Sequence, residues 1–203
     1  MQTLKDDIRN RILIAALTEF GEFGYSNSSM RRIASSAGIT TGNIYRYFRN
    51  KDDLFRELLH PTYEKFVEYT LNIKEEIEKT YTRDATEVFQ YIRMVDETVV
   101  ELLKDSSTEV KILLVLSDDS SYEGLRLDLV AIIKQILEKV FQTSKDCITL
   151  PSSDLLTIQM YATMIIEGIC LILRDHKDGH TIKFLVDELI FVYSVGIAEK
   201  LRK

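Results

Sequence analysis

The chain has 203 residues, of which 45% are hydrophobic and 29% are charged, and its formal net charge is −6. These values are ordinary for a soluble globular protein, whose core forms without disulfide staples. The net charge of −6, taken over the whole chain, excludes a protein that is basic along its entire length. It does not exclude a local basic surface, because an average hides how charge is distributed.

Residues 1–60 carry a net charge of +2, and the other residues carry −8. Between Phe23 and Lys51 there are five basic residues and no acidic one. Such a patch in an otherwise acidic chain is typical of a phosphate-binding surface. A chance run on a solvated helix face is the alternative.

The cellular compartment is predicted from the cysteines and the first residues. Cys147 and Cys170 have no CxxC spacing and lie among apolar residues, so they are interpreted as reduced packing residues. Residues 1–10 are charged and have no apolar signal core. A cytoplasmic protein is therefore expected.

Apolar residues recur at helical spacing in the first fifty residues and predict helices at 8–23, 29–36 and 41–48. Gly24 is expected to end the first helix, and Ser28 and Thr40 are expected to be the N-caps of the next two. Gly38 is expected to adopt a positive φ in the tight turn between them.

One set of apolar residues is expected to form the core of this segment: Leu17, Phe20, Met30, Ile33, Ala34, Ala37, Ile39, Ile44 and Phe48. The small side chain of Ala34 leaves room for two helices that cross steeply at close range. A helix, a sharp turn with glycine and a second helix make a helix-turn-helix unit.

Asn50 is expected to cap a helix that begins at Lys51, and Pro61 is expected to kink or break this helix near Leu59. The remaining helices are predicted at residues 62–78, 85–104, 108–116, 124–141, 154–174 and 181–201. No strand-like alternation stands out, so the predicted class is all-α: a three-helix helix-turn-helix domain followed by a larger helical bundle.

The last two predicted helices, 154–174 and 181–201, are apolar on nearly every side. Paired with their copies across a two-fold axis, they would form a four-helix bundle, so a homodimer through these helices is predicted. Two central helices of a monomer are the alternative. A membrane span is not favoured, because Gln159 and Glu167 would lie in the hydrocarbon.

The stretch from Ala34 to Leu54, ASSAGITTGNIYRYFRNKDDL, resembles the TetR family of bacterial regulators in its turn, recognition helix and start of the fourth helix. Upstream, an Ala-Ala pair, the Phe20 to Tyr25 ending and the two serines before Met30 agree with the same pattern. The resemblance covers residues 8 to about 59. The rest of the chain is similar to the family only in being helical and of suitable length.

The resemblance implies a DNA-binding domain at residues 1–50 and an effector-binding and dimerisation domain at 51–203. It further implies a ligand-responsive repressor that a small molecule releases from a palindromic operator in double-stranded DNA. A DNA-binding protein with a vestigial pocket, and a helical ligand-binding or scaffolding dimer without DNA binding, are the alternatives.

In such a unit, the N-terminal residues of the recognition helix face base edges in the major groove. These are Thr41 and Asn43, whose amide suits adenine, and Gly42, which allows a close approach. Many family members have a basic residue where Thr41 stands, which leaves open the base that Thr41 reads.

Residues expected to contact the DNA backbone surround this helix. Lys51 and the helix N-terminus that it begins are expected to hold a phosphate together. The other predicted backbone contacts are Ser28, Ser29, Arg31, Thr40, Tyr45, Arg46 and Tyr47.

No enzyme motif stands out in the sequence, and neither a catalytic site nor a cofactor is predicted. His176 and His180 have the spacing of a metal pair, but they flank Gly179 in a predicted loop and have no obvious third ligand. No metal site is therefore expected, and the effector contacts stay unassigned.

Overall fold

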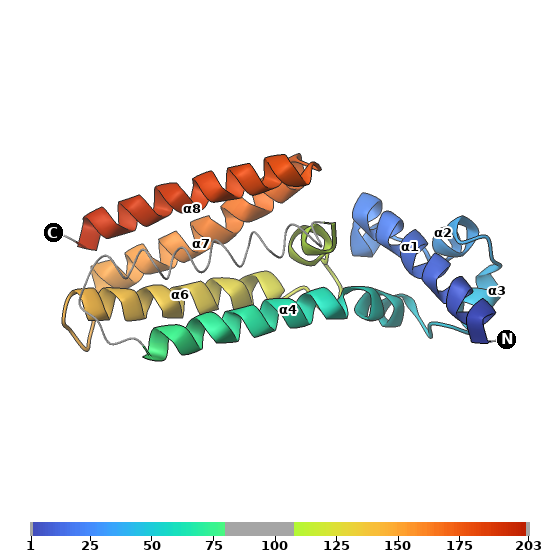
Figure 1. The fold of residues 1–203 in the computed structure, drawn as a ribbon, viewed down its shortest axis with the longest axis horizontal. Helices are drawn as coiled ribbons and strands as arrows, with labels where there is room; N and C mark the ends of the chain where they lie inside the picture. Colours follow the sequence, from blue (N-terminus) through green and yellow to red (C-terminus); the bar gives the residue numbers. More distant parts are fainter. Residues whose placement is uncertain (1, 80–107, 202–203) are drawn as a thin grey trace. The chain divides into compact units, whose positions relative to one another are not determined.

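The structure is a computed structural model that describes residues 2–79 and 108–201; these residues form helices and loops, with no strand among them (Figure 1). The helices are α1 (Gln2–Asn27), α2 (Met30–Ser36), α3 (Thr41–Ile44), α4 (Lys51–Lys79), α6 (Leu125–Ser144), α7 (Ser152–Asp175) and α8 (Gly179–Leu201). Residues 108–115 are also helical. The all-α prediction is confirmed, and the helix predicted at 85–104 lies outside the described residues.

The described residues divide into two compact units. The first contains the residues up to Glu64 together with Thr108–Leu125, and the second contains the residues from Lys65 and from Arg126 onwards. Helix α4 is continuous across the boundary between Glu64 and Lys65, so it contributes to both units.

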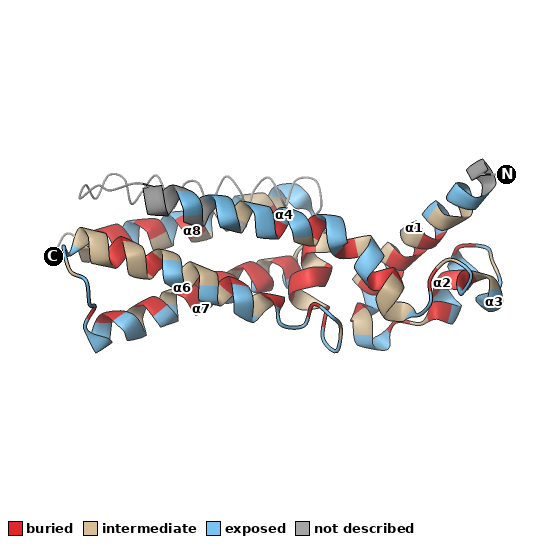
Figure 2. Ribbon diagram, turned by 90° about the horizontal axis from the view of Figure 1, so that it is seen from below, coloured by how far each residue is buried: buried red, intermediate tan, exposed pale blue. Residues whose placement is uncertain are grey.

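Helix α1 provides one side of the core of the first unit. Ile12, Ala16 and Phe20 follow one another at intervals of four and are fully buried (Figure 2), as helical periodicity requires of a core-facing stripe. Gly24 has φ +71° and ψ 170°, a left-handed φ that interrupts the helical geometry where the sequence predicts its end.

The segment 108–125 packs onto α1 and α4. The backbone N–H of Tyr25 donates to the Leu116 carbonyl at 2.8 Å. The buried ring of Tyr122 lies 5.0 Å from that of Tyr63 and 6.1 Å from that of Phe55, between ring centres. A segment distant in sequence thereby belongs to the same core as the first helices.

Helix α4 begins where the sequence predicts, and of the predicted kink or break near Leu59 the break does not occur. The Asn50 side chain accepts a hydrogen bond from the backbone of Asp53 at 2.7 Å, which caps the helix as expected. Pro61 lies inside the continuous helix. Leu59 and Thr62 on either side of it are buried, and this packing holds the helix together despite the missing backbone donor.

Helices α6, α7 and α8 form the described core of the second unit. Its buried cluster is Leu137, Val140, Phe141, Leu150, Ile158, Ala162 and Ile197. α7 packs against α8, and a Cβ at Gly168 would lie 2.9 Å from a methyl carbon of Leu189, so glycine permits this close approach. Cys170 is fully buried, and burial raises the pKa of its thiol.

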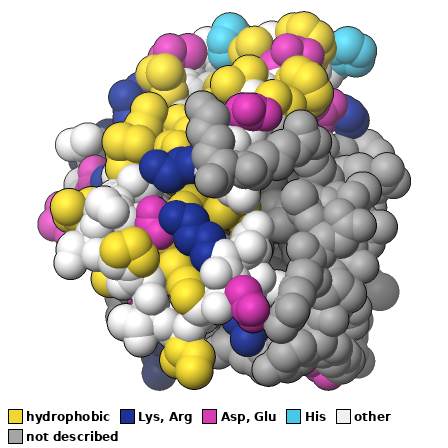
Figure 3. Space-filling view, turned by 90° about the vertical axis from the view of Figure 1, so that its left-hand side faces the viewer, with side chains coloured by type: hydrophobic (Ala, Val, Ile, Leu, Met, Phe, Trp, Pro, Cys, Tyr) yellow, Lys and Arg dark blue, Asp and Glu magenta, His cyan; other side chains and the backbone are white. Residues whose placement is uncertain are grey.

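The other side of α7 and α8 is apolar and exposed. The exposed residues are Leu155, Leu156, Met160, Met164 and Leu171 on α7, and Phe184, Phe191, Val192 and Val195 on α8. Among the described residues, α7 is the one helix long and apolar enough to cross a membrane, a test that a core helix also passes. In Figure 3, hydrophobic side chains lie at the surface between charged ones.

Candidate nucleic-acid interface

Helices α2 and α3 form the predicted helix-turn-helix unit on α1. Ile33, Ala34 and Ile44 are fully buried, so α2 and α3 both turn one face inward. Gly38 has φ +70° in the turn between them, as predicted. Of the predicted core set, Leu17 and Ile39 are only half-buried.

Helix α3 is shorter than predicted. It spans Thr41–Ile44 instead of residues 41–48. Beyond it, the N–H of Arg46 donates to Asn43 and that of Tyr47 to Ile44, at 3.1 and 3.0 Å. These two bonds span three residues rather than four, although the N–H of Phe48 also donates to Ile44 at 3.1 Å, so residues 45–47 form turns after α3.

The predicted N-cap of α3 is confirmed. The Thr40 hydroxyl accepts a hydrogen bond from the backbone N–H of Asn43 at 3.2 Å. Thr41 and Gly42 are exposed, and Asn43 is half-buried. The first turn of α3 is therefore fixed by its cap, while its side chains remain accessible.

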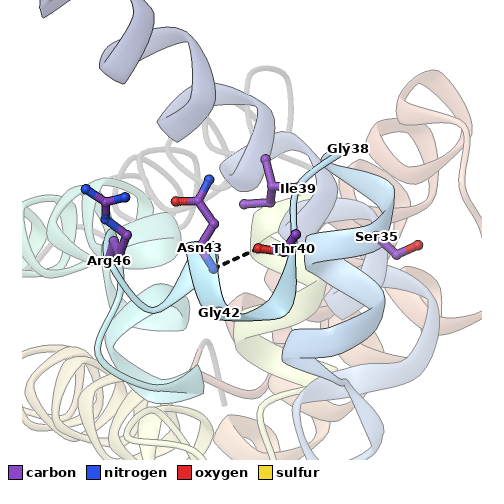
Figure 4. A pocket seen from close by; sticks show the side chains of 7 residues that line it. All are labelled: Ser35, Gly38, Ile39, Thr40, Gly42, Asn43 and Arg46. Carbon is purple, nitrogen blue, oxygen red and sulfur yellow. Dashed lines mark hydrogen bonds between the residues drawn. The ribbon is translucent and has the colours of Figure 1, made fainter.

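An open hollow lies over this turn, lined by Ser35, Gly38, Ile39, Thr40, Gly42, Asn43 and Arg46. The side chains of Asn43 and Arg46 extend to the same side of α3 (Figure 4). A Cβ at Gly42 would meet no atom within 4 Å. The surface thus presents an amide and a guanidinium beside a bare backbone position.

The basic residues of this segment differ in their partners. Arg32 donates to Glu19 at 2.7 Å, and Arg49 pairs with Asp53 at 3.1 Å. Arg31 and Arg46 are exposed and form no ion pair with any residue that the structure describes. These two arginines are therefore the free charges of the patch that the sequence indicates.

Lys51 lies deeper than expected. Its ammonium donates to the carbonyls of Tyr25, Ser26 and Ser28 at 2.7, 3.3 and 3.4 Å, and it lies 4.3 Å from the ring centre of Tyr25. Burial lowers the pKa of Lys51, which the charge of Asp119 partly opposes. These contacts give Lys51 a structural role at the end of α1.

The prediction that Ser28 caps α2 is wrong. Ser28 is buried, and its hydroxyl donates to carbonyls of α1, those of Gly24 and Glu19. The N-cap residue is Ser29, whose side chain makes no cap bond. The chain leaves helical geometry at Gly24, and beyond this kink Ser28 lies against the carbonyls of α1.

Glu19 is the residue that sequence reasoning missed. It looks like a solvated residue between apolar ones, yet it is only 8% exposed. Its carboxylate accepts from the backbone of Ser29 at 2.9 Å and from Arg32 at 2.7 Å. Glu19 thereby supplies, from α1, the side-chain acceptor for the start of α2 that Ser28 was expected to supply.

The two predicted tyrosines differ in exposure. Tyr45 is 50% exposed, and Tyr47 is half-buried.

No group of three or more His, Cys, Asp or Glu side chains in the described part of the chain is arranged to hold a metal ion.

Comparison with known proteins identifies a family match over the helix-turn-helix unit of α2 and α3. Residues 12–58 match a family described as bacterial regulatory proteins, tetR family, and this range covers α2 and α3 with parts of α1 and α4. The segment 12–58 is therefore a TetR-family segment. The resemblance that the sequence indicates is thereby confirmed.

Individual relatives agree. The HTH-type transcriptional regulator AcrR of Shigella flexneri is 44% identical over 52 residues, which are 26% of this chain and 24% of AcrR. The structure of FadR from Bacillus subtilis in complex with stearoyl-CoA has a TM-score of 0.54 and 20% identity, covering 92% of this chain and 97% of FadR. AibR in complex with isovaleryl coenzyme A and operator DNA has a TM-score of 0.55 and 16% identity, covering 91% and 97%.

At these identities the solved structures establish the shared fold. The matches to the first curated relatives span 24%, 30% and 64% of those proteins' own lengths. The chain therefore spans less than two thirds of the length of each of these curated relatives.

Proposed function

We propose that this TetR-family protein is a sequence-specific DNA-binding transcriptional regulator that inserts α3 into the major groove. The observation that carries the proposal is the exposed first turn of α3, where Asn43 and Arg46 extend to one side over a bare Gly42. The buried core fixes the position of this turn, so the side chains of the turn are positioned to contact base edges.

The residues of the site are assigned by their exposure. Thr41, Gly42 and Asn43 face base edges, and Asn43 pairs with adenine through its donor and acceptor. The proposed backbone contacts are Ser29, Arg31, Thr40, Tyr45, Arg46 and Tyr47. Ser28 and Lys51 act from within the fold, by fixing the end of α1 against α2 and α4.

The exposed apolar face of α7 and α8 is the proposed homodimer interface. Phe191 and Val192 are 62% and 64% exposed on α8, and Leu156 is 73% exposed on α7. A second copy would cover this face across a two-fold axis, as in a four-helix bundle. The dimer would then bind a near-palindromic operator.

In this proposal, residues 1–50 bind DNA, and residues 51–203 dimerise and bind a small molecule that releases the repressor. By linkage, DNA weakens effector binding by the same factor as the effector weakens DNA binding. FadR and AibR were solved with acyl-coenzyme A molecules, so acyl-CoA thioesters of several chain lengths are the first compounds to test. No cofactor or catalytic activity belongs to the proposal.

The proposed location is the cytoplasm, with no membrane partner. Helix α7 places Ile158 and Ala162 in the core cluster and packs against α8, which supports a core and interface role for it.

The deciding experiment is fluorescence anisotropy of the full chain on DNA selected from a random pool and on DNA from upstream of its own gene. The expected result is tight, salt-sensitive binding. Asn43→Ala should remove sequence discrimination worth about 1–3 kcal/mol per site, whereas Gln135→Ala, on the exposed side of α6, should bind as the unsubstituted protein does. If neither DNA source is bound in the absence of ligand, a helical dimer without DNA binding replaces this proposal.

A further inference from the structure

Arg11, on an exposed position of α1, reaches the turn that leads into α3. Its Nη1 atom lies 3.5 Å from the position that a Cβ on Gly38 would occupy. Gly38 has φ +70° and lines the hollow over α3. A basic group from outside α2 and α3 therefore stands at the edge of the proposed DNA surface.

The charge of Arg11 is available to an incoming anion. Its ion pair with Asp7 joins Nε to Oδ2 at 3.4 Å, and the two side chains are 46% and 63% exposed. A pair this accessible to water contributes little stability, so an anion displaces the carboxylate readily.

Arg9, two residues earlier, provides the contrast. It pairs with Glu57 on α4 and lies 5.7 Å from the ring centre of Phe48, and these contacts fasten it to the fold. Among the described residues, Arg11 forms its ion pair with Asp7 on its own helix, and its Nη1 atom lies beside the glycine turn. Arg11 is thus held over the turn without being tied to another helix by an ion pair.

We infer that Arg11 is a further DNA-contacting residue, which binds a backbone phosphate beside the half-site that α3 reads. The planar guanidinium suits a phosphate because two N–H groups can donate to two oxygens at once. Asp7 competes with the phosphate for this guanidinium. The inference rests on the proposed function and assigns to α1 a contact that the sequence prediction left out.

Arg11 could instead stabilise the Gly38 turn without contacting DNA, and this structural role predicts other results than a phosphate contact does. A structural role would change thermal stability and leave unchanged the number of counterions released from DNA. A phosphate contact would change the salt dependence of binding. A substitution of Asp7 separates the two further, because it removes the competitor and leaves Arg11 in place.

The test is anisotropy of the full chain on a duplex that the unsubstituted protein selects from random DNA, across a salt series. Arg11→Gln should weaken binding by roughly three- to tenfold and reduce the slope of log K against log salt by about 0.9 for each bound protomer. Arg11→Lys should keep the slope, and Asp7→Asn should strengthen binding. Lys177→Gln, an exposed charge in the second unit, is the matched control.

The outcomes separate the inference from the proposed function. If the unsubstituted protein binds but Arg11→Gln has the slope of Lys177→Gln, the inference is overturned and the proposed function stands. Equal weakening by Arg11→Gln and Arg11→Lys, with lowered melting temperatures, also overturns it in favour of the structural role. If the unsubstituted protein selects no DNA, both fail.

Discussion

At the scale of single residues, accessibility distinguishes the side chains that are open to a partner from those that hold the unit together. Asn43, Arg46 and Arg31 are accessible. The charged groups of Glu19 and Lys51 instead form hydrogen bonds within the fold. The sequence treats all these polar residues alike. Their contacts divide them into an accessible group, which is proposed to bind DNA, and a structural group.

Gly42→Ala should weaken DNA binding without weakening the fold. A Cβ at this position meets nothing within 4 Å, and alanine favours helix over glycine by up to about 1 kcal/mol. The added methyl group would face the groove, so operator affinity should fall by about tenfold, or about 1.4 kcal/mol. Anisotropy and thermal melting measure the two effects.

The control for this variant is Gly124→Ala, in a loop of the same unit, where a Cβ also meets nothing within 4 Å. It should change neither DNA binding nor stability. Unchanged affinity of Gly42→Ala would show that α3 does not approach DNA at this position.

Glu19→Gln should destabilise the first unit by about 1–3 kcal/mol, because it removes a buried charge that accepts hydrogen bonds from Ser29 and Arg32. Urea unfolding measures the loss. Glu22→Gln, one turn of α1 away and exposed, should stay within about 0.5 kcal/mol of the unsubstituted protein. Equal effects of the two variants would contradict the role assigned to Glu19.

At the scale of elements, local signals predict the caps of α3 and α4 better than how far these two helices run. The caps at Thr40 and Asn50 form as predicted because each is a contact across three residues. The length of α3 and the continuity of α4 through Pro61 do not follow from such short-range contacts. They depend on how the helix packs, which local sequence does not contain.

The turn between α3 and α4 should show a defined pH dependence. Hydrogen bonds from Arg49 hold the pKa of Asp53 below its usual value of 3.8. The stabilisation is therefore complete above that value and is lost as the pH falls through the lower pKa of the folded protein. Asp53→Asn should lower the melting temperature by a constant amount from pH 7 to pH 5, and the difference should shrink below about pH 4.

Asp128→Asn, on the exposed side of α6, is the comparison for this experiment. It should follow the unsubstituted protein over the whole pH range. A melting difference for Asp53→Asn that stays constant down to pH 3 would refute the stabilising role of the Arg49 pair.

At the scale of the whole molecule, two long helices combine a buried and an exposed apolar face. Ile158 and Ile190 are buried on α7 and α8, while Leu156 and Val192 lie exposed on the same helices. A face this apolar is costly to leave in water, which supports its coverage by a second copy.

Val192→Glu should convert the dimer to a monomer, since the new carboxylate would be buried against apolar groups of the partner. Sedimentation velocity measures the mass, and operator affinity should fall with it. Leu127→Glu, at a position on α6 that is 73% exposed against 64% for Val192, should leave the dimer intact. A dimer that persists in Val192→Glu would place the interface elsewhere.

The sequence by itself determines the helix-turn-helix unit, its family and the first turn of α3, because caps, a glycine turn and helical spacing act over a few residues. Only the tertiary structure decides that Glu19 is buried, that Lys51 holds the end of α1, and that residues 108–125 join the first unit. The physical reason is that burial and partner choice depend on residues far apart in the chain. A charged side chain has the same local sequence signal whether it faces water, a buried carbonyl or DNA.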